Sequence, residues 1–361
     1  MDNFDYAQHF YHKLATARGS SCLLQVELHP GPHCDLYQCP HCYGHGQLTL
    51  PGQALTAGEF GAALDDAVEF APTVIMSGVT TEPLTHAEPA AVIAEVRRRG
   101  LPLGLYTKGR RLEGDVVDAL LEGSGECFVT VSIDEVDPGA YLARHGLRMA
   151  STERGPGGLS AADYQRRVLD NVRAFKARRD ALGAAVELRI ALLLFAENSD
   201  ERAAVEAVGS LVDLADRLRI AFPQNRNDGQ PAGEMPGDTA GVLDRLKRRF
   251  DGNPKVRILH DTAKPVRNPD FNRCRAQRFQ ITIDRCGNLF PCPQVAVQPY
   301  RHLSFGNVRE QPLRSLLHSP RRLAMFEWEV DRQMRCRICD RKDEAVNVAL
   351  ADLSRAFDRP A

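Results

Sequence analysis

The chain has 361 residues, of which 43% are apolar and 26% are charged, an ordinary composition for a folded protein. Its 46 lysines and arginines nearly balance its 47 aspartates and glutamates, so no overall charge favours nucleic acid or an acidic membrane. The sequence shows no apolar run near the ~20 residues that span a bilayer, and no basic start followed by an apolar stretch as in a signal peptide. We therefore expect a cytoplasmic protein with no nucleic-acid or membrane partner.

Strands and helices are predicted to alternate from residue 23 to about residue 250. The predicted strands are rich in Val, Ile and Leu without strict alternation, as expected for strands covered on both faces. They are expected at 23–29, 73–78, 103–107, 128–133, 186–195 and 217–222, and the helices at about 57–71, 87–99, 112–122, 160–180, 200–215 and 238–250. Six strand–helix units in succession predict an α/β fold with a parallel sheet.

The pattern changes after about residue 250. Glycines and prolines mark a loop-rich stretch, then a short hairpin is expected over 279–291 and a helix over about 342–356. This division predicts an N-terminal extension (1–22), a core of six units (23–250), a small cysteine-rich α+β domain (251–345), and a C-terminal helix and tail (346–361).

Ten cysteines stand out in a chain expected in a reducing compartment, where cysteines bind metal or do chemistry more often than they form disulfides. Cys22 and Cys127 lie in or beside apolar strands and are expected in the core. The other eight fall into two groups, one near each end of the chain.

The first cysteine group, Cys34, Cys39 and Cys42, has the spacing C-x4-C-x2-C and follows the first predicted strand. Ligand sites in parallel α/β folds lie at that edge of the sheet. Soft thiolates select zinc, copper(I) or iron–sulfur clusters. A zinc site completed by a neighbouring histidine (His33, His41 or His45) is one reading, and a four-iron cluster with one open iron is the other.

This loop resembles the radical S-adenosylmethionine superfamily, whose usual motif is C-x3-C-x2-C, one residue shorter than here. The resemblance implies a partial (β/α)6 barrel similar to a TIM barrel. It also implies a [4Fe-4S] cluster on the first cysteine group, S-adenosylmethionine as cosubstrate, and an electron donor such as flavodoxin or ferredoxin.

Later strand ends match the same superfamily in order. The segment S-G-V-T-T-E-P-L at 77–84 is similar to its Gly-Gly-Glu-Pro-Leu stretch, whose Glu holds the amino group of S-adenosylmethionine. His41 stands where an aromatic residue packs on the adenine, and Ser132 stands where a serine reaches the ribose. The resemblance covers residues 20 to 225 and implies seven cosubstrate-binding residues: His41, Gly78, Thr80, Glu82, Thr107, Ser132 and Asn198.

The second cysteine group resembles the auxiliary-cluster domains of the superfamily, called SPASM or, when shortened, twitch domains. The stretch D-x-x-G-x-x-x-P-C at 284–292 fits their hairpin, and the spacing C-x17-C-x43-C-x2-C is similar to that of the butirosin-pathway aminocyclitol dehydrogenase. The resemblance implies one auxiliary [4Fe-4S] cluster; a structural zinc site on the same thiolates is the alternative. Its ligands would be Cys274, Cys292, Cys336 and Cys339.

Function is predicted as hydrogen abstraction by a 5′-deoxyadenosyl radical from a small polar substrate, such as the alcohol of a sugar or aminocyclitol. A radical epimerase is an alternative, in which Cys286 would donate the hydrogen atom; a hairpin thiol without that role is the plainer reading of this residue. Peptide modification is a further alternative, although about 20 residues before the first strand leave no room for a leader-binding domain. A non-catalytic zinc-binding protein is the last alternative. For the enzymatic readings, His145 and Glu187 are candidate bases.

Overall fold

The computed structural model describes residues 23–36, 39–137, 139–141, 161–230, 232, 236–259, 271–336 and 339–357. The predicted N-terminal extension and the candidate base His145 lie outside the described residues. Within them, one sheet has the strand order β7-β6-β5-β4-β3-β2-β1-β8-β9. The strands are β1 Gln25–His29, β2 Thr73–Met76, β3 Leu103–Thr107, β4 Cys127–Ser132, β5 Val186–Leu193, β6 Arg217–Ala221, β7 Val256–Ile258, β8 Gln280–Asp284 and β9 Leu289–Phe290.

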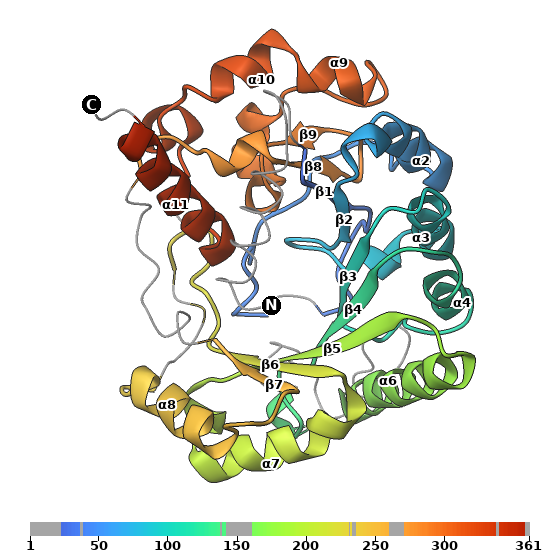
Figure 1. Ribbon diagram of the computed structural model, residues 1–361, viewed down its shortest axis with the longest axis vertical. Coiled ribbons are helices and arrows are strands. Elements are labelled where there is room, and N and C mark those ends of the chain that lie inside the picture. The colour runs from blue at the N-terminus through green and yellow to red at the C-terminus, as the bar shows by residue number, and fades with distance from the viewer. Residues whose placement is uncertain are drawn as a thin grey trace.

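Strands β1 to β7 are parallel and lie in chain order, and an α-helix follows each of the first six strands. These helices lie on the outer, convex side of the curved sheet (Figure 1), and the concave side is here called the lumen. The predicted partial (β/α)6 barrel is confirmed. The helices are α2 Ala57–Asp65, α3 Pro89–Arg98, α4 Asp115–Leu121, α6 Ala161–Leu182, α7 Glu201–Leu211 and α8 Thr239–Arg249.

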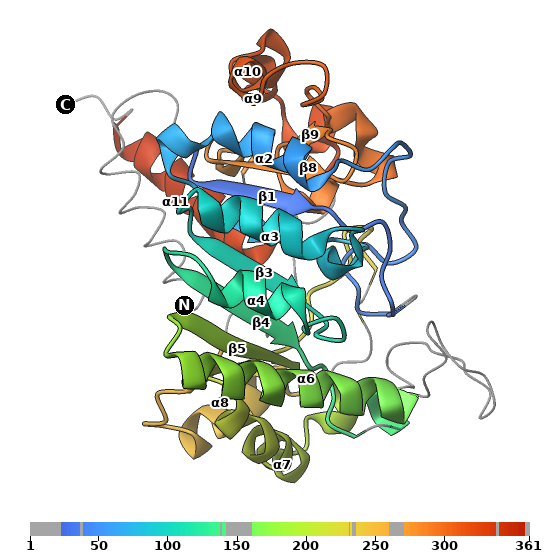
Figure 2. The same ribbon diagram turned by 90° about the vertical axis from the view of Figure 1, so that its right-hand side faces the viewer.

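Two parts of the sheet extend beyond the predicted core. Strand β7 lies after residue 250, in the stretch expected to be loop, and pairs in parallel with β6. The predicted hairpin forms as β8 and β9, but β8 pairs in parallel with β1 and so joins the barrel sheet. Three further helices complete the C-terminal region (Figure 2): α9 Leu313–Leu317, α10 Pro320–Met325 and α11 Arg341–Phe357.

The strands alternate more strictly than the sequence suggested. Leu188, Ile190, Leu218 and Ile220 are at most 1% exposed and belong to the core between sheet and helices. The residues between them are polar or charged and face the lumen. The expectation of strands with two apolar faces is therefore wrong for β5 and β6, because the open barrel covers only their outer face with helices.

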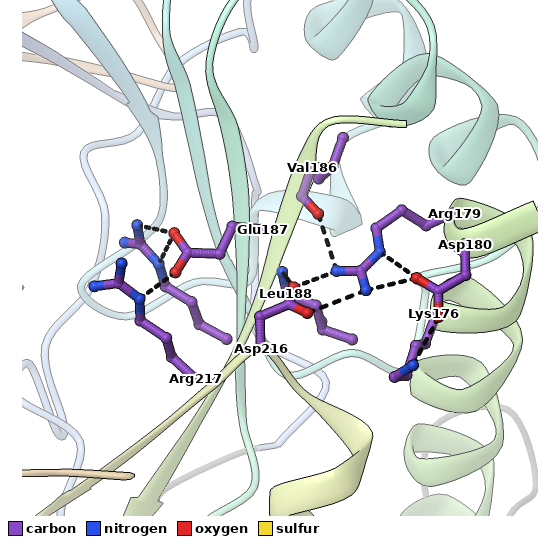
Figure 3. Close-up of polar contacts among 9 residues, drawn as sticks. Lys176, Arg179, Asp180, Val186, Glu187, Leu188, Asp216 and Arg217 are labelled. Carbon is purple, nitrogen blue, oxygen red and sulfur yellow. Dashed lines mark hydrogen bonds and ion pairs between the residues drawn. The ribbon is translucent and has the colours of Figure 1, made fainter. Parts of the chain in front are cut away.

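The outer face of β5 and β6 carries an ionic contact of its own. Arg179 of α6 donates a hydrogen bond to the Val186 carbonyl oxygen at 3.0 Å and binds the Asp216 carboxylate. Figure 3 shows this contact on one side of β5, and Glu187 with Arg217 on the other. The pairs fix α6 against the strands and mark which side chains point into the lumen.

Candidate active site

The first cysteine group lies on the loop that leaves β1, at the carboxyl edge of the parallel strands. Cys39 is buried, Cys34 and Cys42 are half-buried, and all three line one cavity. The loop is held by Asp35, a buried carboxylate 3.2 Å from the guanidinium nitrogens of both Arg110 and Arg111. The loop after β3 thus fixes the thiols in place.

These thiols fit a positively charged metal centre. Burial raises the pKa of Cys34 and Cys39 to about 12; Cys42 further raises the pKa of both, and Cys34 that of Cys39. Buried thiolates this close need a compensating positive charge, which metal ligation supplies while it removes the thiol protons. A cluster of several irons binds each sulfur at a different iron, so the thiols need not converge on one point.

A single zinc ion fits the first group less well. His45 places Nδ1 2.9 Å from the Cys39 carbonyl oxygen, His41 places Nε2 3.3 Å from Asp134 Oδ2, and His33 is exposed. Across the described ranges, no three His, Cys, Asp or Glu side chains lie close enough together to hold one metal ion. The geometry therefore favours the cluster over the zinc site.

Glu82 is the most constrained polar residue near these thiols. Its carboxylate accepts hydrogen bonds from Thr107 Oγ1 at 2.5 Å and from the Lys108 backbone N–H at 2.8 Å. Its own backbone N–H donates to the His33 carbonyl oxygen at 2.9 Å, which ties this strand end to the cysteine loop. Burial raises the pKa of Glu82, so its ionised form is best stabilised by a cationic group in the cavity.

Four more of the predicted cosubstrate residues line the same cavity: His41, Gly78, Thr80 and Ser132. The His41 ring packs edge-to-face on Phe195, with centroids 5.2 Å apart. At Gly78 a Cβ atom would lie 2.3 Å from Thr81 Oγ1, so the turn after β2 admits only glycine without rearrangement. The structure thus brings residues from four strand ends to one place.

Asn198 and Cys286 are not brought there. Asn198 is buried and bonds locally, accepting from the Phe195 backbone N–H at 2.6 Å and donating to Glu135 at 3.2 Å. Cys286 lies at the tip of the β8–β9 hairpin, and its thiol faces the Leu50 carbonyl oxygen at 3.6 Å. Neither side chain is among those that line the cavity.

The second cysteine group gathers at the C-terminal region beside the same cavity. Burial raises the pKa of Cys274 to about 11 and of Cys336 to about 12, and it raises the pKa of Cys292 and Cys339 well above the usual value. Cys274 further raises the pKa of Cys292, Cys336 and Cys339, and Cys292 raises that of Cys339, so the four thiols lie near one another. Like the thiols of the first group, these thiols are buried and near one another, so a bound positively charged cluster would stabilise their ionised form.

A cavity of about 930 Å³ lies between the first cysteine group and residues next to the second group. The first cysteine group lines it directly. On the other side it is lined by Gln294, two residues after Cys292, and by Asp340, the residue after Cys339. A volume of this order accommodates a cosubstrate together with a small substrate.

The sequence did not identify several polar residues of this cavity. Lys108 forms an ion pair with the buried Asp134 at 2.6 Å, directly beside His41. The lumen also holds arginines from three neighbouring strands, and Glu187, the candidate base, is ion-paired to two of them. Charged residues at alternate positions in the first half of β5 (Glu187, Arg189) and of β6 (Arg217, Arg219) were the available signal. These arginines are Arg189, Arg217, Arg219 and Arg257.

Comparisons with known proteins agree with this geometry. Residues 274–340 match the SPASM family, an iron–sulfur cluster-binding domain. The AdoMet-dependent heme synthase of Methanosarcina barkeri is 23% identical over 335 residues, which cover 89% of this chain and 88% of that protein.

Solved structures share the fold at low sequence identity. Streptococcus suis SuiB bound to S-adenosylmethionine superposes with a TM-score of 0.62 at 15% identity, covering 89% of this chain and 72% of that one. Native anSMEcpe with bound AdoMet gives a TM-score of 0.56 at 16% identity, covering 84% of this chain and 83% of that one.

Proposed function

We propose that this chain is a radical S-adenosylmethionine enzyme with a C-terminal SPASM domain and that it removes two hydrogens from an alcohol of a small polar substrate. Its cofactors are a [4Fe-4S] cluster that binds S-adenosylmethionine, an auxiliary [4Fe-4S] cluster, and S-adenosylmethionine itself. The observation that carries the proposal is the cavity lined by the first cysteine group and by Gln294 and Asp340, which are close in sequence to Cys292 and Cys339 of the second group.

At the first site, we assign the cluster to Cys34, Cys39 and Cys42. The Glu82 carboxylate would bind the amino group of S-adenosylmethionine, because hydrogen bonds from Thr107 Oγ1 and from the backbone N–H groups of Lys108 and Leu84 orient it at the cavity wall. Ser132 and His41 line the same cavity and would contact the nucleoside.

When bound, the first cluster and S-adenosylmethionine supply hydrogen-atom abstraction, and the auxiliary cluster supplies an acceptor for one electron. We assign the auxiliary cluster to the second cysteine group, Cys274, Cys292, Cys336 and Cys339. Four protein ligands leave no iron open, which suits electron transfer rather than substrate binding.

The proposed reaction balances as the oxidation of an alcohol to a carbonyl. The carbon loses one hydrogen atom, the hydroxyl loses one proton, and one electron leaves the substrate. The walls of the lumen hold the target carbon in place and exclude water. An electron donor such as flavodoxin or ferredoxin and a cytoplasmic location remain part of the proposal, since both sites require reduced thiols.

Metal analysis and one substitution test the assignment of the two sites. The anaerobically prepared protein is expected to hold about eight irons per chain, from two four-iron clusters. Cys39→Ala is expected to abolish reductive cleavage of S-adenosylmethionine and to leave the absorbance of the auxiliary cluster. Undiminished cleavage in that variant, or zinc in place of iron, would refute the assignment.

Product mass separates the proposed oxidation from the two alternatives. A substrate that loses two mass units supports the dehydrogenase. An unchanged mass with inverted stereochemistry supports an epimerase. A new crosslink within a peptide supports a maturase.

A further inference from the structure

The lumen of the barrel is lined by an excess of guanidinium groups on β5, β6 and β7. Arg189 lies opposite Arg217 in the strand register, and Arg219 lies opposite Arg257. All four line the cavity that also holds the first cysteine group. Arg189, Arg217 and Arg219 are only partly exposed, so their like charges are costly unless anions balance them, whereas Arg257 is exposed at the cavity wall.

The protein balances only part of this charge. Glu187 accepts from Arg189 Nη2 and from Arg217 Nε, both at 2.5 Å (Figure 3 shows the contact with Arg217). Arg189 also stacks on the Phe128 ring, with its guanidinium carbon 3.8 Å from the ring centroid. One carboxylate thus serves two arginines and fixes both of them.

The other two arginines have no such partner within the described ranges. Among the described residues, neither Arg219 nor Arg257 forms an ion pair, and the buried Nε of Arg219 has no hydrogen-bond partner. Glu126 and Asp340 also line the cavity, but neither forms an ion pair with these arginines within the part of the chain that the structure describes. A buried N–H donor without an acceptor costs free energy that an incoming ligand recovers.

We infer that the substrate carries an oxyanion group, a carboxylate or a phosphate, that binds Arg219 and Arg257. Both groups match the planar fork of a guanidinium, which binds them through paired hydrogen bonds. This inference rests on the proposed function for the presence of a substrate in the lumen, and it narrows the substrate class to anions.

The position of the two arginines also sets the size of the substrate. Arg219 precedes the end of β6 at Ala221 by two residues, or roughly 7 Å of strand. The first cysteine group lies at the carboxyl edge of the same cavity, so we expect a substrate held by its anion at the arginines to extend toward that edge. A phosphorylated or carboxylated sugar has about this length, and the cationic amine of an aminocyclitol is disfavoured beside the arginines.

Equilibrium binding to the cluster-loaded protein tests the inference without any turnover. The probes are glucose 6-phosphate, glucuronate, glucose and glucosamine, titrated at about 0.15 M salt to screen surface charge. We expect one or both anionic sugars to bind at least about tenfold more tightly than glucose and glucosamine. The anion that binds more tightly distinguishes a phosphate from a carboxylate.

Two substitutions locate the binding site. We expect each of Arg219→Gln and Arg257→Gln to lower the affinity for the anionic sugar about tenfold or more. The affinity for glucose should stay unchanged. Arg202→Gln on the outer helix α7 is the matched control, since that side chain is 87% exposed, and it should bind like the parent protein. If low iron content shows that Arg219→Gln fails to fold, the test is made with Arg257→Gln, because that side chain is exposed.

If neither glucose 6-phosphate nor glucuronate binds more tightly than glucose, the inference is overturned, and unchanged anion binding in both arginine variants would also overturn it. Cleavage of S-adenosylmethionine is measured separately. Absent cleavage with intact anion binding refutes the proposed function alone, and intact cleavage without anion binding refutes this inference alone.

Discussion

Glu82 shows how one residue of the site is fixed by its neighbours. Thr107 Oγ1 and the Lys108 backbone N–H both donate to its carboxylate, so each of its oxygens has a donor. The sequence identified Glu82 and Thr107 through the order of strand ends. It could not show that they contact each other, because 25 residues separate them and only the pairing of β2 with β3 brings them together.

Glu82→Gln tests this arrangement. The amide nitrogen of glutamine must face one of the two donors, and the neutral side chain no longer attracts an ammonium group. We expect the affinity for S-adenosylmethionine to fall about tenfold or more, with iron content unchanged. Equilibrium binding measures this, with Glu206→Gln on the exposed face of α7 as the control. Unaltered affinity would remove Glu82 from the cosubstrate site.

For Cys286, unlike Glu82, we expect a substitution to have little effect. Its thiol faces the Leu50 carbonyl oxygen and lies outside the cavity lining. Cys286→Ser keeps a hydroxyl donor toward that carbonyl, so we expect product formation within about twofold of the parent protein. Arrested turnover with normal cleavage of S-adenosylmethionine would instead support an epimerase with this thiol as hydrogen donor.

At the scale of elements, the sequences of strands β5 and β6 indicate strands with one apolar and one charged face. The segments V-E-L-R-I-A-L-L and R-L-R-I-A alternate apolar with charged residues, a pattern typical of a strand with one covered face. Their high Val, Ile and Leu content favoured a strand correctly. The sequence does not show which face of the sheet the charged side chains lie on, or that β5, β6 and β7 lie side by side. Only the pairing of the strands and the curvature of the sheet decide this.

The contact between α2 and the hairpin region gives a pH-dependent prediction. Arg309 binds the Glu59 carboxylate and the carbonyl oxygens of Gln53 and Ala54. Hydrogen bonding from Arg309 lowers the pKa of Glu59 from 4.5 to about 2. The contribution of this pair is therefore complete above about pH 5 and is lost as the pH falls from about 4.5 toward 2.

Arg309→Gln tests this contact through the free energy of unfolding. The pair is largely exposed, so we expect a loss of at most about 1 kcal/mol, constant from about pH 8 to pH 5.5 and smaller by about pH 4. Anaerobic urea unfolding measures the loss, with the exposed Arg332→Gln as control. A loss that grows on acidification would contradict the assigned pKa.

For the whole molecule, the barrel and the C-terminal region share one sheet, because β8 pairs with β1. The two cysteine groups therefore keep fixed positions on either side of one cavity. No helix in the described ranges is long and apolar enough to cross a membrane.

Cys292→Ser separates the two sites. We expect it to lose about half of the iron, to retain cleavage of S-adenosylmethionine, and to lose most product formation, because the proposed acceptor of the second electron is gone. Iron analysis with parallel assays of 5′-deoxyadenosine and product checks this. Full product formation without the auxiliary cluster would exclude its role as acceptor.

The sequence by itself determined the six strand–helix units, both cysteine groups and most residues at the strand ends, because these depend on local periodicity and on spacing along the chain. Tertiary structure alone decided that β7 and β8 extend the sheet, that Asn198 and Cys286 lie away from the cavity, and that four arginines meet in the lumen. Contacts of this kind depend on strand pairing and sheet curvature, which bring together residues far apart in the chain.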